Sequence, residues 1–176
     1  MEENMQKETL VLLAKYNKIA NEKMDAVIKT LSPGEWDKPL GGFFKSVRGA
    51  CSHIYICDFN YCKRFSSLRE FNIFKEPFFS RDPYPFSETI FADMGEYLVK
   101  RPEMDAKLTA FAAELRDGDM DSILKYKDSR GNPVEKVFGG LVMHNFNHDT
   151  HHRGMLSLYL ELLGKDNDFN SLAPFL

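Results

Sequence analysis

The sequence predicts an all-α fold, and within that class an up-and-down four-helix bundle fits best. Four long stretches carry apolar side chains every three or four residues, which is the period of an amphipathic helix. Proline and glycine residues, which end helices, gather between these stretches. The chain has 176 residues, 43% of them apolar, which suits one globular domain over residues 1–176. The predicted helices cover approximately residues 6–31, 46–68, 87–115 and 134–163.

The first predicted helix has a continuous apolar stripe and a clear end. Ser32-Pro33-Gly34 stops it, because proline has no backbone N–H to donate and glycine readily leaves the helical conformation. Residues 35–44 then form a connecting segment that contains Pro39 and two adjacent glycines. The stripe consists of Leu13, Tyr16, Ala20, Met24, Val27 and Leu31.

The second predicted helix follows Ser46, whose hydroxyl can accept a hydrogen bond from an unpaired backbone N–H of the first turn. Its inner face is apolar, with Asp58 as a polar exception that we expect at the edge of that face. His53 lies beside the same face and can point inward. An odd number of cysteines within one helix indicates packed thiols and not a disulfide framework, and this helix holds Cys51, Cys57 and Cys62.

Residues 70–86 are rich in phenylalanine and proline, which suits an ordered loop packed by aromatic rings. A connection of this length is unusual, and it favours a role at the mouth of a site or at an interface. The third predicted helix opens at Ser87 and Glu88. Pro102 within it removes one backbone hydrogen bond, so we expect a kink or a break there.

Residues 122–136 contain the signal for β-structure. Two short apolar runs flank Asp128-Ser129-Arg130-Gly131, which is a turn sequence, so the segment forms either a short hairpin or an irregular loop. The last predicted helix follows and ends at Gly164, since glycine accepts the left-handed conformation that closes a helix. The tail, residues 168–176, ends in apolar residues and is expected to pack back on the bundle.

Charge and hydropathy argue against two classes of partner. The net charge of −3 and the pI near 6.0 give no indication of a nucleic-acid-binding surface. No run of about 18 apolar residues exists, so the sequence predicts no membrane-spanning helix. The first residues, Met1-Glu2-Glu3-Asn4, are acidic and polar, unlike a signal peptide, and we therefore expect a cytoplasmic protein.

Four of the five histidines lie in the last predicted helix, between Met143 and Gly154. His144, His148 and His152 recur every four residues, so their side chains share one helix face, with Cβ atoms about 5–6 Å apart. Two imidazoles one turn apart can bind one metal ion. The alternative is a solvated helix face, on which histidines at this spacing also occur.

The most economical ligand set is His53, His148 and His152. His151 projects about 100° away from His152 around the helix, so only one of the two faces a given ion. Three protein ligands leave a position for water or substrate, which is the catalytic and not the structural pattern. Neutral imidazoles suit zinc, nickel, iron or copper, and the ligand type alone does not choose among them.

Several neighbours complete the predicted site. His144 is expected to line the pocket or to contact one of the ligand histidines without binding the metal itself. Cys57, one turn after His53, is a candidate fourth ligand, although we favour a packed thiol. Three side chains are candidates to accept a ring N–H from a ligand histidine, and these are Asn145, Asn147 and Asp149.

Two residues after the histidines also need an explanation. Arg153 could bind a carboxylate or phosphate near the site, but a surface arginine is the commoner case. Gly154 inside a helix costs about 1 kcal/mol relative to alanine, which suggests close approach to another helix.

The histidine-rich block also resembles a known family. Residues 147–154, Asn-His-Asp-Thr-His-His-Arg-Gly, are similar to the last-helix signature of the DinB/YfiT-like superfamily. The resemblance covers nearly the whole chain. The other similar segments are Tyr16-Asn17 with Ala20-Asn21, Phe44 to Arg48 leading to His53 and Asp58, and Tyr126 to Gly131.

This resemblance implies a four-helix bundle with a divalent metal, zinc or nickel, held by one histidine of the second helix and two of the last. Carried over, these ligands are His53, His148 and His152. Family members with known activity are mostly transferases or isomerases that use low-molecular-weight thiols, and members are often dimers. We therefore expect a homodimeric, metal-dependent thiol transferase with a small-molecule substrate. The alternatives are a metal-dependent hydrolase and a non-catalytic, stress-related metal-binding dimer.

Overall fold

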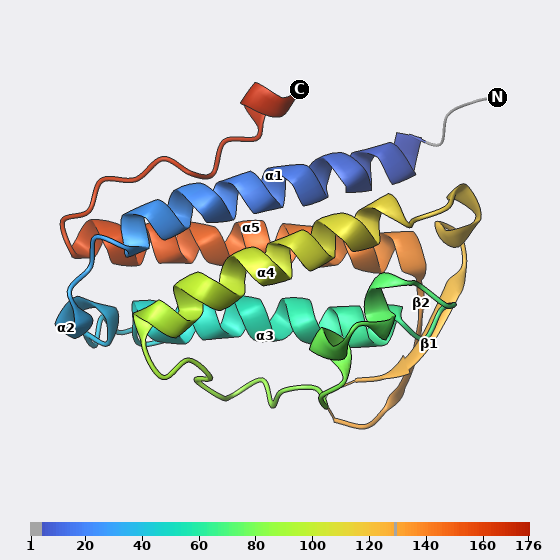
Figure 1. Cartoon of the computed structure of the whole chain (residues 1–176), viewed down its shortest axis with the longest axis horizontal. Coiled ribbons are helices and arrows are strands. Elements are labelled where there is room, and N and C mark those ends of the chain that lie inside the picture. The colour runs from blue at the N-terminus through green and yellow to red at the C-terminus, as the bar shows by residue number, and fades with distance from the viewer. Residues whose placement is uncertain (1–4, 129) are drawn as a thin grey trace.

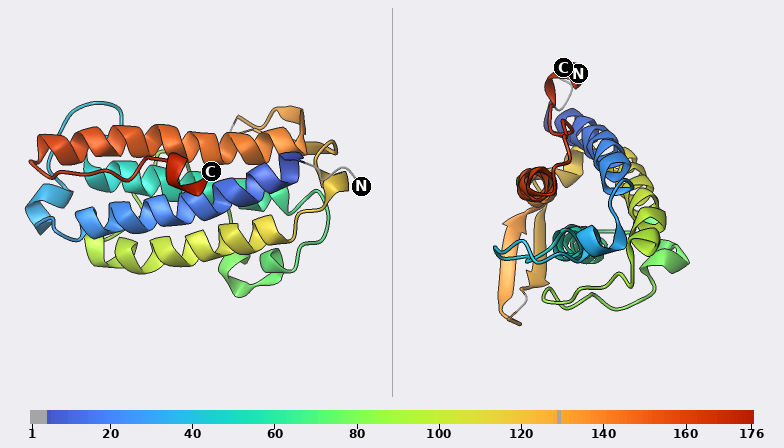
Figure 2. Two further views of the ribbon diagram at one scale, coloured as in Figure 1. Left: turned by 90° about the horizontal axis from the view of Figure 1, so that it is seen from above. Right: turned by 90° about the vertical axis from the view of Figure 1, so that its left-hand side faces the viewer.

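The computed structural model describes residues 5–128 and 130–176, and it confirms the all-α prediction. Four long helices form a bundle in which α1 and α3 each pack on α4 and α5 (Figures 1 and 2). The long helices are α1 (Met5–Ile28), α3 (Val47–Phe65), α4 (Met94–Ala113) and α5 (Phe138–Leu162). The shorter elements are α2 (Pro33–Trp36), the strands β1 (Ile123–Lys127) and β2 (Pro133–Val137), and the 3₁₀ turns η1 (Ile73–Lys75), η2 (Pro77–Phe79), η3 (Asp117–Asp119) and η4 (Ala173–Phe175).

The helices do not alternate in direction, so the up-and-down topology is wrong. Segment 66–93 returns along the bundle, and α3 and α4 therefore run parallel (Figure 1). Trp36, before α3, packs 5.5 Å from Tyr97 near the start of α4, and Phe65 at the end of α3 stacks 5.3 Å from Phe111 near the end of α4. An extended chain covers about 3.3 Å per residue, so this segment is long enough to return along a neighbouring helix.

The first connection contains a short helix that the sequence prediction left as loop. The Ser32 hydroxyl accepts the Glu35 backbone N–H at 3.3 Å, and the Glu35 carboxylate accepts the Ser32 N–H at 2.7 Å. This reciprocal pair satisfies two backbone donors that a helix start otherwise leaves unpaired. The helix α2 thereby buries Trp36 at the end of the bundle that also carries the start of α3.

α4 starts at Met94 and not at Ser87. Asp93 caps it, because its Oδ1 accepts the Glu96 backbone N–H at 2.8 Å. The helix continues through Pro102 to Ala113, so the predicted break is absent. Residues 87–93 therefore remain outside the helix, and they contribute walls to two surface cavities described below.

The β-signal before the last helix is a hairpin. β1 and β2 pair antiparallel, with Tyr126 opposite Val134. The Asp128 carboxylate accepts the backbone N–H groups of Arg130 and Asn132 at 2.8 and 2.9 Å, which stabilises the turn. β2 leads directly into α5, whose first residue is Phe138 and not residue 134 as predicted.

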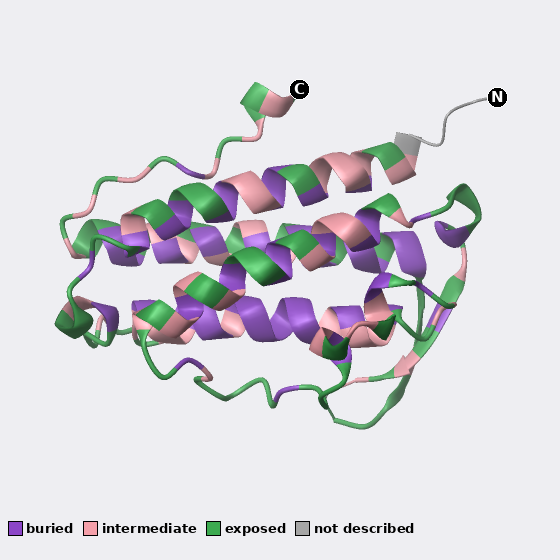
Figure 3. Cartoon of the chain, in the orientation of Figure 1, coloured by how far each residue is buried: buried purple, intermediate pink, exposed green. Residues whose placement is uncertain are grey.

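Buried residues line the inner faces of the four helices (Figure 3). The aromatic loop packs on this core as predicted, since Phe71 and Phe74 lie 5.3 and 5.2 Å from Phe111. The tail also returns to the bundle, where the Tyr16 hydroxyl donates to the Asn170 carbonyl at 3.0 Å. Among the described residues, no helix combines the length and apolar content that a bilayer span requires.

Candidate metal centre

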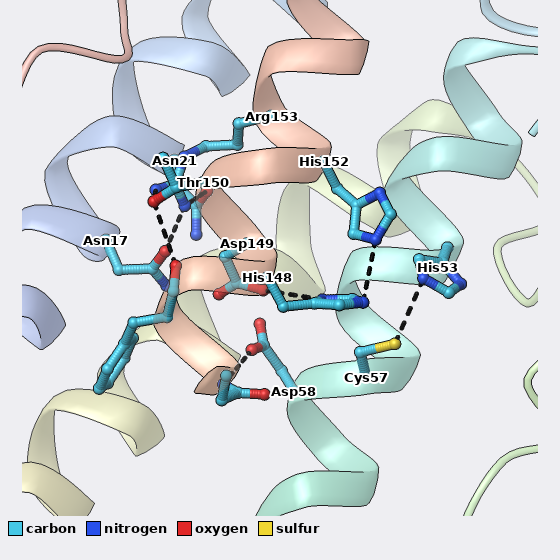
Figure 4. Close-up of polar contacts among 12 residues, drawn as sticks. Asn17, Asn21, His53, Cys57, Asp58, His148, Asp149, Thr150, His152 and Arg153 are labelled. Atoms are coloured by element: carbon cyan, nitrogen blue, oxygen red, sulfur yellow. Dashed lines mark hydrogen bonds and ion pairs between the residues drawn. The ribbon is translucent and has the colours of Figure 1, made fainter. Parts of the chain in front are cut away.

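The structure brings the three histidines of the economical set together from two helices. His53 comes from α3, whereas His148 and His152 lie one turn apart on α5 (Figure 4). Their ring centroids are 5.3 Å (His53–His148), 4.6 Å (His53–His152) and 4.1 Å (His148–His152) apart. The packing of α3 on α5 is therefore what assembles the cluster.

The spacing of ring nitrogens suits a shared ion. Nε2 of His148 and Nε2 of His152 are 2.9 Å apart. Two nitrogens that bind one ion at about 2.1 Å are about 3.0–3.4 Å apart when they subtend 90–109°. The remaining ring nitrogens, Nδ1 of His148 and of His152, are buried without a hydrogen-bond partner. The two rings thus direct Nε2 toward one point.

The protonation of the cluster also suits a metal. Burial, together with a smaller effect of the neighbouring histidines, lowers the pKa of His53 to about 4 and that of His152 to about 3. Burial likewise lowers the pKa of His148. At neutral pH the rings are therefore uncharged, and an uncharged imidazole has the lone pair that a metal ligand needs.

Cys57 belongs to the same cluster. Its Sγ lies 3.5 Å from His53 Nε2, and the ligand atoms of His53, Cys57 and His148 all lie within 4.8 Å of one another. The thiol is buried, and burial raises its pKa, so it is protonated when no ion is present. The described residues thus offer His53, Cys57 and His148 as one three-ligand group. His152 is the alternative third ligand, because its Nε2 lies 2.9 Å from that of His148 and its ring lies 4.6 Å from that of His53.

Asp149 is the candidate acceptor for His148. Its Oδ1 lies 4.0 Å from His148 Nδ1, and neither carboxylate oxygen has a hydrogen-bond partner (Figure 4). Burial raises the pKa of Asp149, and the carboxylate of Asp58 raises it further. The other two predicted acceptors lie elsewhere, because Asn145 donates to Asp58 at 2.9 Å and Asn147 is exposed.

A buried charge network lies behind the histidines, and it corrects the prediction for Asp58. This residue is fully buried and not at an edge, and its carboxylate accepts from Arg101 Nη1 at 2.7 Å. Arg101 Nη2 also donates to Asp105 at 2.8 Å. Arg101 was missed from the sequence, although it falls at helical spacing between Tyr97 and Met104 on the inner stripe of α4. Its position on this stripe was the sequence signal that could have indicated a buried arginine.

Arg153 is part of the interior, so its interpretation as a surface arginine is wrong. Its side chain is fully buried, and Nη1 donates to Asn17 and, at 3.3 Å, to Asn21. Nη2 donates to the Thr150 hydroxyl at 3.1 Å. Gly154 is exposed and an added Cβ would meet nothing within 4 Å, so close approach to another helix does not explain it.

The remaining histidines lie outside the cluster. His144 is exposed and its ring is 6.0 Å from that of His148, where it lines a cavity together with Tyr61. His151 is exposed on another face of α5. This arrangement is consistent with His144 as a pocket-lining residue, whereas the His151 ring lies 4.8 Å from that of His152, at the exposed edge of the cluster.

His53 is the member of the histidine cluster that lines a cavity of about 280 Å³. Phe44, which the sequence reasoning did not select, packs 4.7 Å from the His53 ring and 5.1 Å from the His152 ring. His53 and Glu88 both line the cavity. A small molecule in this space would therefore have access to the cluster and to one carboxylate.

The fold and the cluster together define a class, that of helical-bundle proteins with a candidate metal site built from histidines of two helices. A family model described as DinB family matches residues 5–168, and the chain belongs to the DinB family. No curated protein and no solved structure matches the chain.

Proposed function

We propose that this DinB-family chain is a metal-dependent enzyme that transfers a small-molecule thiol to an electrophile. His53, His148 and His152 would hold one divalent ion, zinc or nickel. The observation that carries this proposal is the convergence of three neutral imidazoles beside a cavity that can admit a substrate. Three protein ligands leave coordination positions for that substrate.

The ion would need to supply only one function, the activation of a bound nucleophile. A divalent ion at such a site lowers the pKa of a bound thiol or water and so supplies a nucleophile at neutral pH. The protein's own groups would set the geometry. Asp149 Oδ1, 4.0 Å from His148 Nδ1, would orient that ring once the contact tightens, and Phe44 packs against the rings of His53 and His152.

The choice of His152 over Cys57 rests on protonation. Ligation by Cys57 requires removal of a proton from a buried thiol whose pKa is raised, whereas His152 is already neutral at physiological pH. Cys57 then remains a packed thiol beside the site.

Hydrolysis is the second candidate reaction, and one observation favours it. Glu88 lines the cavity next to His53, and a carboxylate in that place could act as a general base toward water. Asp149 is unsuited to that role because it is fully buried behind His148. Glu88→Gln should abolish a hydrolytic activity and leave thiol transfer largely intact.

Cobalt(II) substitution tests the proposal with a readout that does not depend on turnover. The cobalt-loaded protein should show no thiolate-to-cobalt absorption by itself, and the band should appear when 2-mercaptoethanol is added. Cys57→Ser should behave in the same way, because the sulfur comes from the added thiol. A band that precedes the thiol and disappears in Cys57→Ser would instead identify a closed site with Cys57 as ligand.

Activity is then assayed with the metal-loaded protein, low-molecular-weight thiols and a panel of electrophiles. His148→Ala should lose both metal and turnover, whereas Asn147→Ala, at an exposed position of the same helix, should keep both. Full metal occupancy without turnover on any thiol, electrophile or ester would contradict the enzyme proposal. It would favour the non-catalytic metal-binding protein, for which a homodimer remains the expected form.

A further inference from the structure

A second cavity, of about 770 Å³, lies farther along α3 and carries several positive charges. Lys63 and Arg64 of α3 and Lys127 of β1 line it. Among the described residues, none of these three cations has a carboxylate oxygen within 4.0 Å. The one acidic lining residue, Asp128, uses its carboxylate to accept the N–H groups of the hairpin turn. The cavity thus carries a net positive charge.

The walls of this cavity are fixed by specific contacts. Asn60 Nδ2 donates to the Tyr84 carbonyl at 2.8 Å, and Asn60 Oδ1 accepts the Tyr84 N–H at 2.9 Å. This pair fastens the aromatic loop to α3. Lys63 Nζ donates to the Phe79 carbonyl at 2.8 Å, so its charge is held close to the loop. A preformed wall lowers the entropic cost of binding a ligand there.

Arg64 is positioned by aromatic rings. Its guanidinium carbon lies 4.9 Å from the ring centroid of Tyr61, 5.0 Å from that of Tyr126 and 5.7 Å from that of Phe86. Rings at these distances stabilise the cation and restrict the side chain. Guanidinium groups bind carboxylates and phosphates through two parallel hydrogen bonds.

The cavity shares a wall with the pocket that His53 lines. Phe86 and Ser87 line both this cavity and the smaller one that contains His53. Arg64 follows His53 by eleven residues on the same helix, which places the two Cα atoms roughly 16 Å apart along its axis. A ligand that reached from one to the other would be an extended molecule of roughly 10–16 Å.

We propose that this cavity binds the anionic end, carboxylate or phosphate, of an extended substrate whose reacting end reaches the histidine cluster. The inference deepens the proposed function and rests on it for the reacting end. The anion-binding part stands on Lys63, Arg64 and Lys127 alone. It can therefore be tested without the metal centre.

The first experiment measures binding of inorganic phosphate and of succinate by calorimetry to the zinc-loaded protein. Both wild type and the metal-free His148→Ala variant should bind at least one probe with similar, millimolar affinity, roughly −4 kcal/mol. The tighter probe identifies the preferred anionic group. Binding by wild type that is absent from His148→Ala would place the anion at the metal centre and overturn the proposal, as would no binding to either protein.

Charge variants locate the site. Arg64→Gln and Lys127→Gln should each weaken binding of the chosen probe by at least about tenfold. Lys127 is exposed on β1, so that variant remains informative if Arg64→Gln fails to fold. The matched control is Arg81→Gln, because Arg81 packs 3.4 Å over the Tyr84 ring but does not line the cavity. Equal weakening by the control would show a general charge effect and contradict a specific site.

The link to the reacting end is tested with two forms of one thiol. Cobalt-loaded wild type should bind glutathione at least about tenfold more tightly than its dimethyl ester, and Lys127→Gln should remove that preference while binding of 2-mercaptoethanol stays unchanged. A preference that survives the substitution would overturn the inference. If no thiol binds cobalt although phosphate still requires Arg64, the proposed thiol chemistry fails and the anion site stands.

Discussion

At the scale of single residues, the two ring nitrogens of His148 have different surroundings. Nε2 lies 2.9 Å from Nε2 of His152, and Nδ1 lies 4.0 Å from the carboxylate of Asp149. The buried Asp149 oxygens have no hydrogen-bond partner, and a buried acceptor without a partner is costly. A divalent ion on Nε2 would make Nδ1–H a stronger donor, so metal binding and the His148–Asp149 contact should reinforce each other.

Asp149→Asn should therefore weaken metal binding by about 10–100-fold, because an amide oxygen is a weaker acceptor for His148 Nδ1–H than a carboxylate while the side-chain volume stays the same. Zinc affinity, measured by competition with a chelating dye, checks this. Asn147→Ala, at an exposed position of the same helix, is the control and should leave the affinity unchanged. An unchanged affinity in Asp149→Asn would mean that the carboxyl group stays protonated and gives His148 no support.

At the scale of elements, the turn before α3 positions the ring that covers the histidines. Lys45 has a φ of 66°, and Leu40 N–H donates to its carbonyl at 2.7 Å. Ser46 then caps α3 through the Gly49 N–H at 3.1 Å. The same turn places Phe44 against His53 and His152. The start of α3 and the cover of the metal centre are thus one structural unit.

Gly49→Ala tests this unit. An added Cβ would lie 2.1 Å from the Phe44 carbonyl oxygen, so the backbone of the turn must move. We expect a loss of about 2–4 kcal/mol in the free energy of unfolding, together with weaker metal binding as Phe44 shifts. Chemical denaturation and metal titration measure the two effects. An unchanged free energy of unfolding in this variant would show that the turn can move without loss of stability, and it would contradict this account.

Gly154→Ala is the contrasting substitution on α5. Nothing lies within 4 Å of an added Cβ, and the position is exposed inside a helix. Alanine should therefore raise the free energy of unfolding by about 0.5–1 kcal/mol through its higher helix propensity. Thermal and urea unfolding curves check this, and a destabilised variant would indicate a contact at this surface, for example with a second protein chain.

The elements also show what the sequence could predict. Periodicity located four long helices because each has a buried stripe, and the turn signal at residues 128–131 marked the hairpin. Periodicity could not give the direction of α4, because the direction depends on the path of segment 66–93. The start of α4 was also misplaced, since Ser87 and Asp93 are equally good caps by residue type and only tertiary contacts choose between them.

For the site, spacing placed His144, His148 and His152 on one face of a helix but did not choose among them. The proximity of His53 was a hypothesis about two distant segments, and the structure places its ring beside those of His148 and His152. The partners of Arg153 could not be read from the sequence, because no local pattern distinguishes a buried arginine from an exposed one. Its contacts to Asn17 and Asn21 depend on how α1 packs on α5.

At the scale of the whole molecule, buried charges link all four helices. Tyr97 of α4 donates to Asp25 of α1 at 2.8 Å, and Asn21 of α1 donates to Asp105 of α4 at 2.7 Å. Arg101 then connects Asp105 to Asp58 of α3, and Asn145 of α5 donates to Asp58 at 2.9 Å. Such a network should make the stability of the bundle depend on pH.

Asp25 is the residue of this network for which the pH dependence of stability is clearest. Burial raises its pKa from 3.8 to about 7, although the Tyr97 hydroxyl and Arg101 oppose the shift. The folded state therefore holds a proton that the unfolded state releases between about pH 4 and pH 7, and the free energy of unfolding falls as pH rises through this window. The full shift corresponds to at most about 4 kcal/mol.

Asp25→Asn removes this titration and keeps an acceptor for the Tyr97 hydroxyl. Relative to wild type, the variant should gain stability as pH rises from about 4 to about 8. Urea unfolding of both proteins in a chelator across that range isolates the effect, because the histidines titrate equally in each. A difference in stability that stays constant with pH would contradict the assignment.

The most direct test of the metal centre is a crystal structure of the zinc-loaded protein with anomalous diffraction at the zinc edge. We expect one ion bound by Nε2 of His148, Nε2 of His152 and a ring nitrogen of His53, each at about 2.0–2.1 Å, with a water or thiol completing the shell. An ion bound elsewhere, or one from which His53 remains out of bonding range, would contradict the three-histidine site.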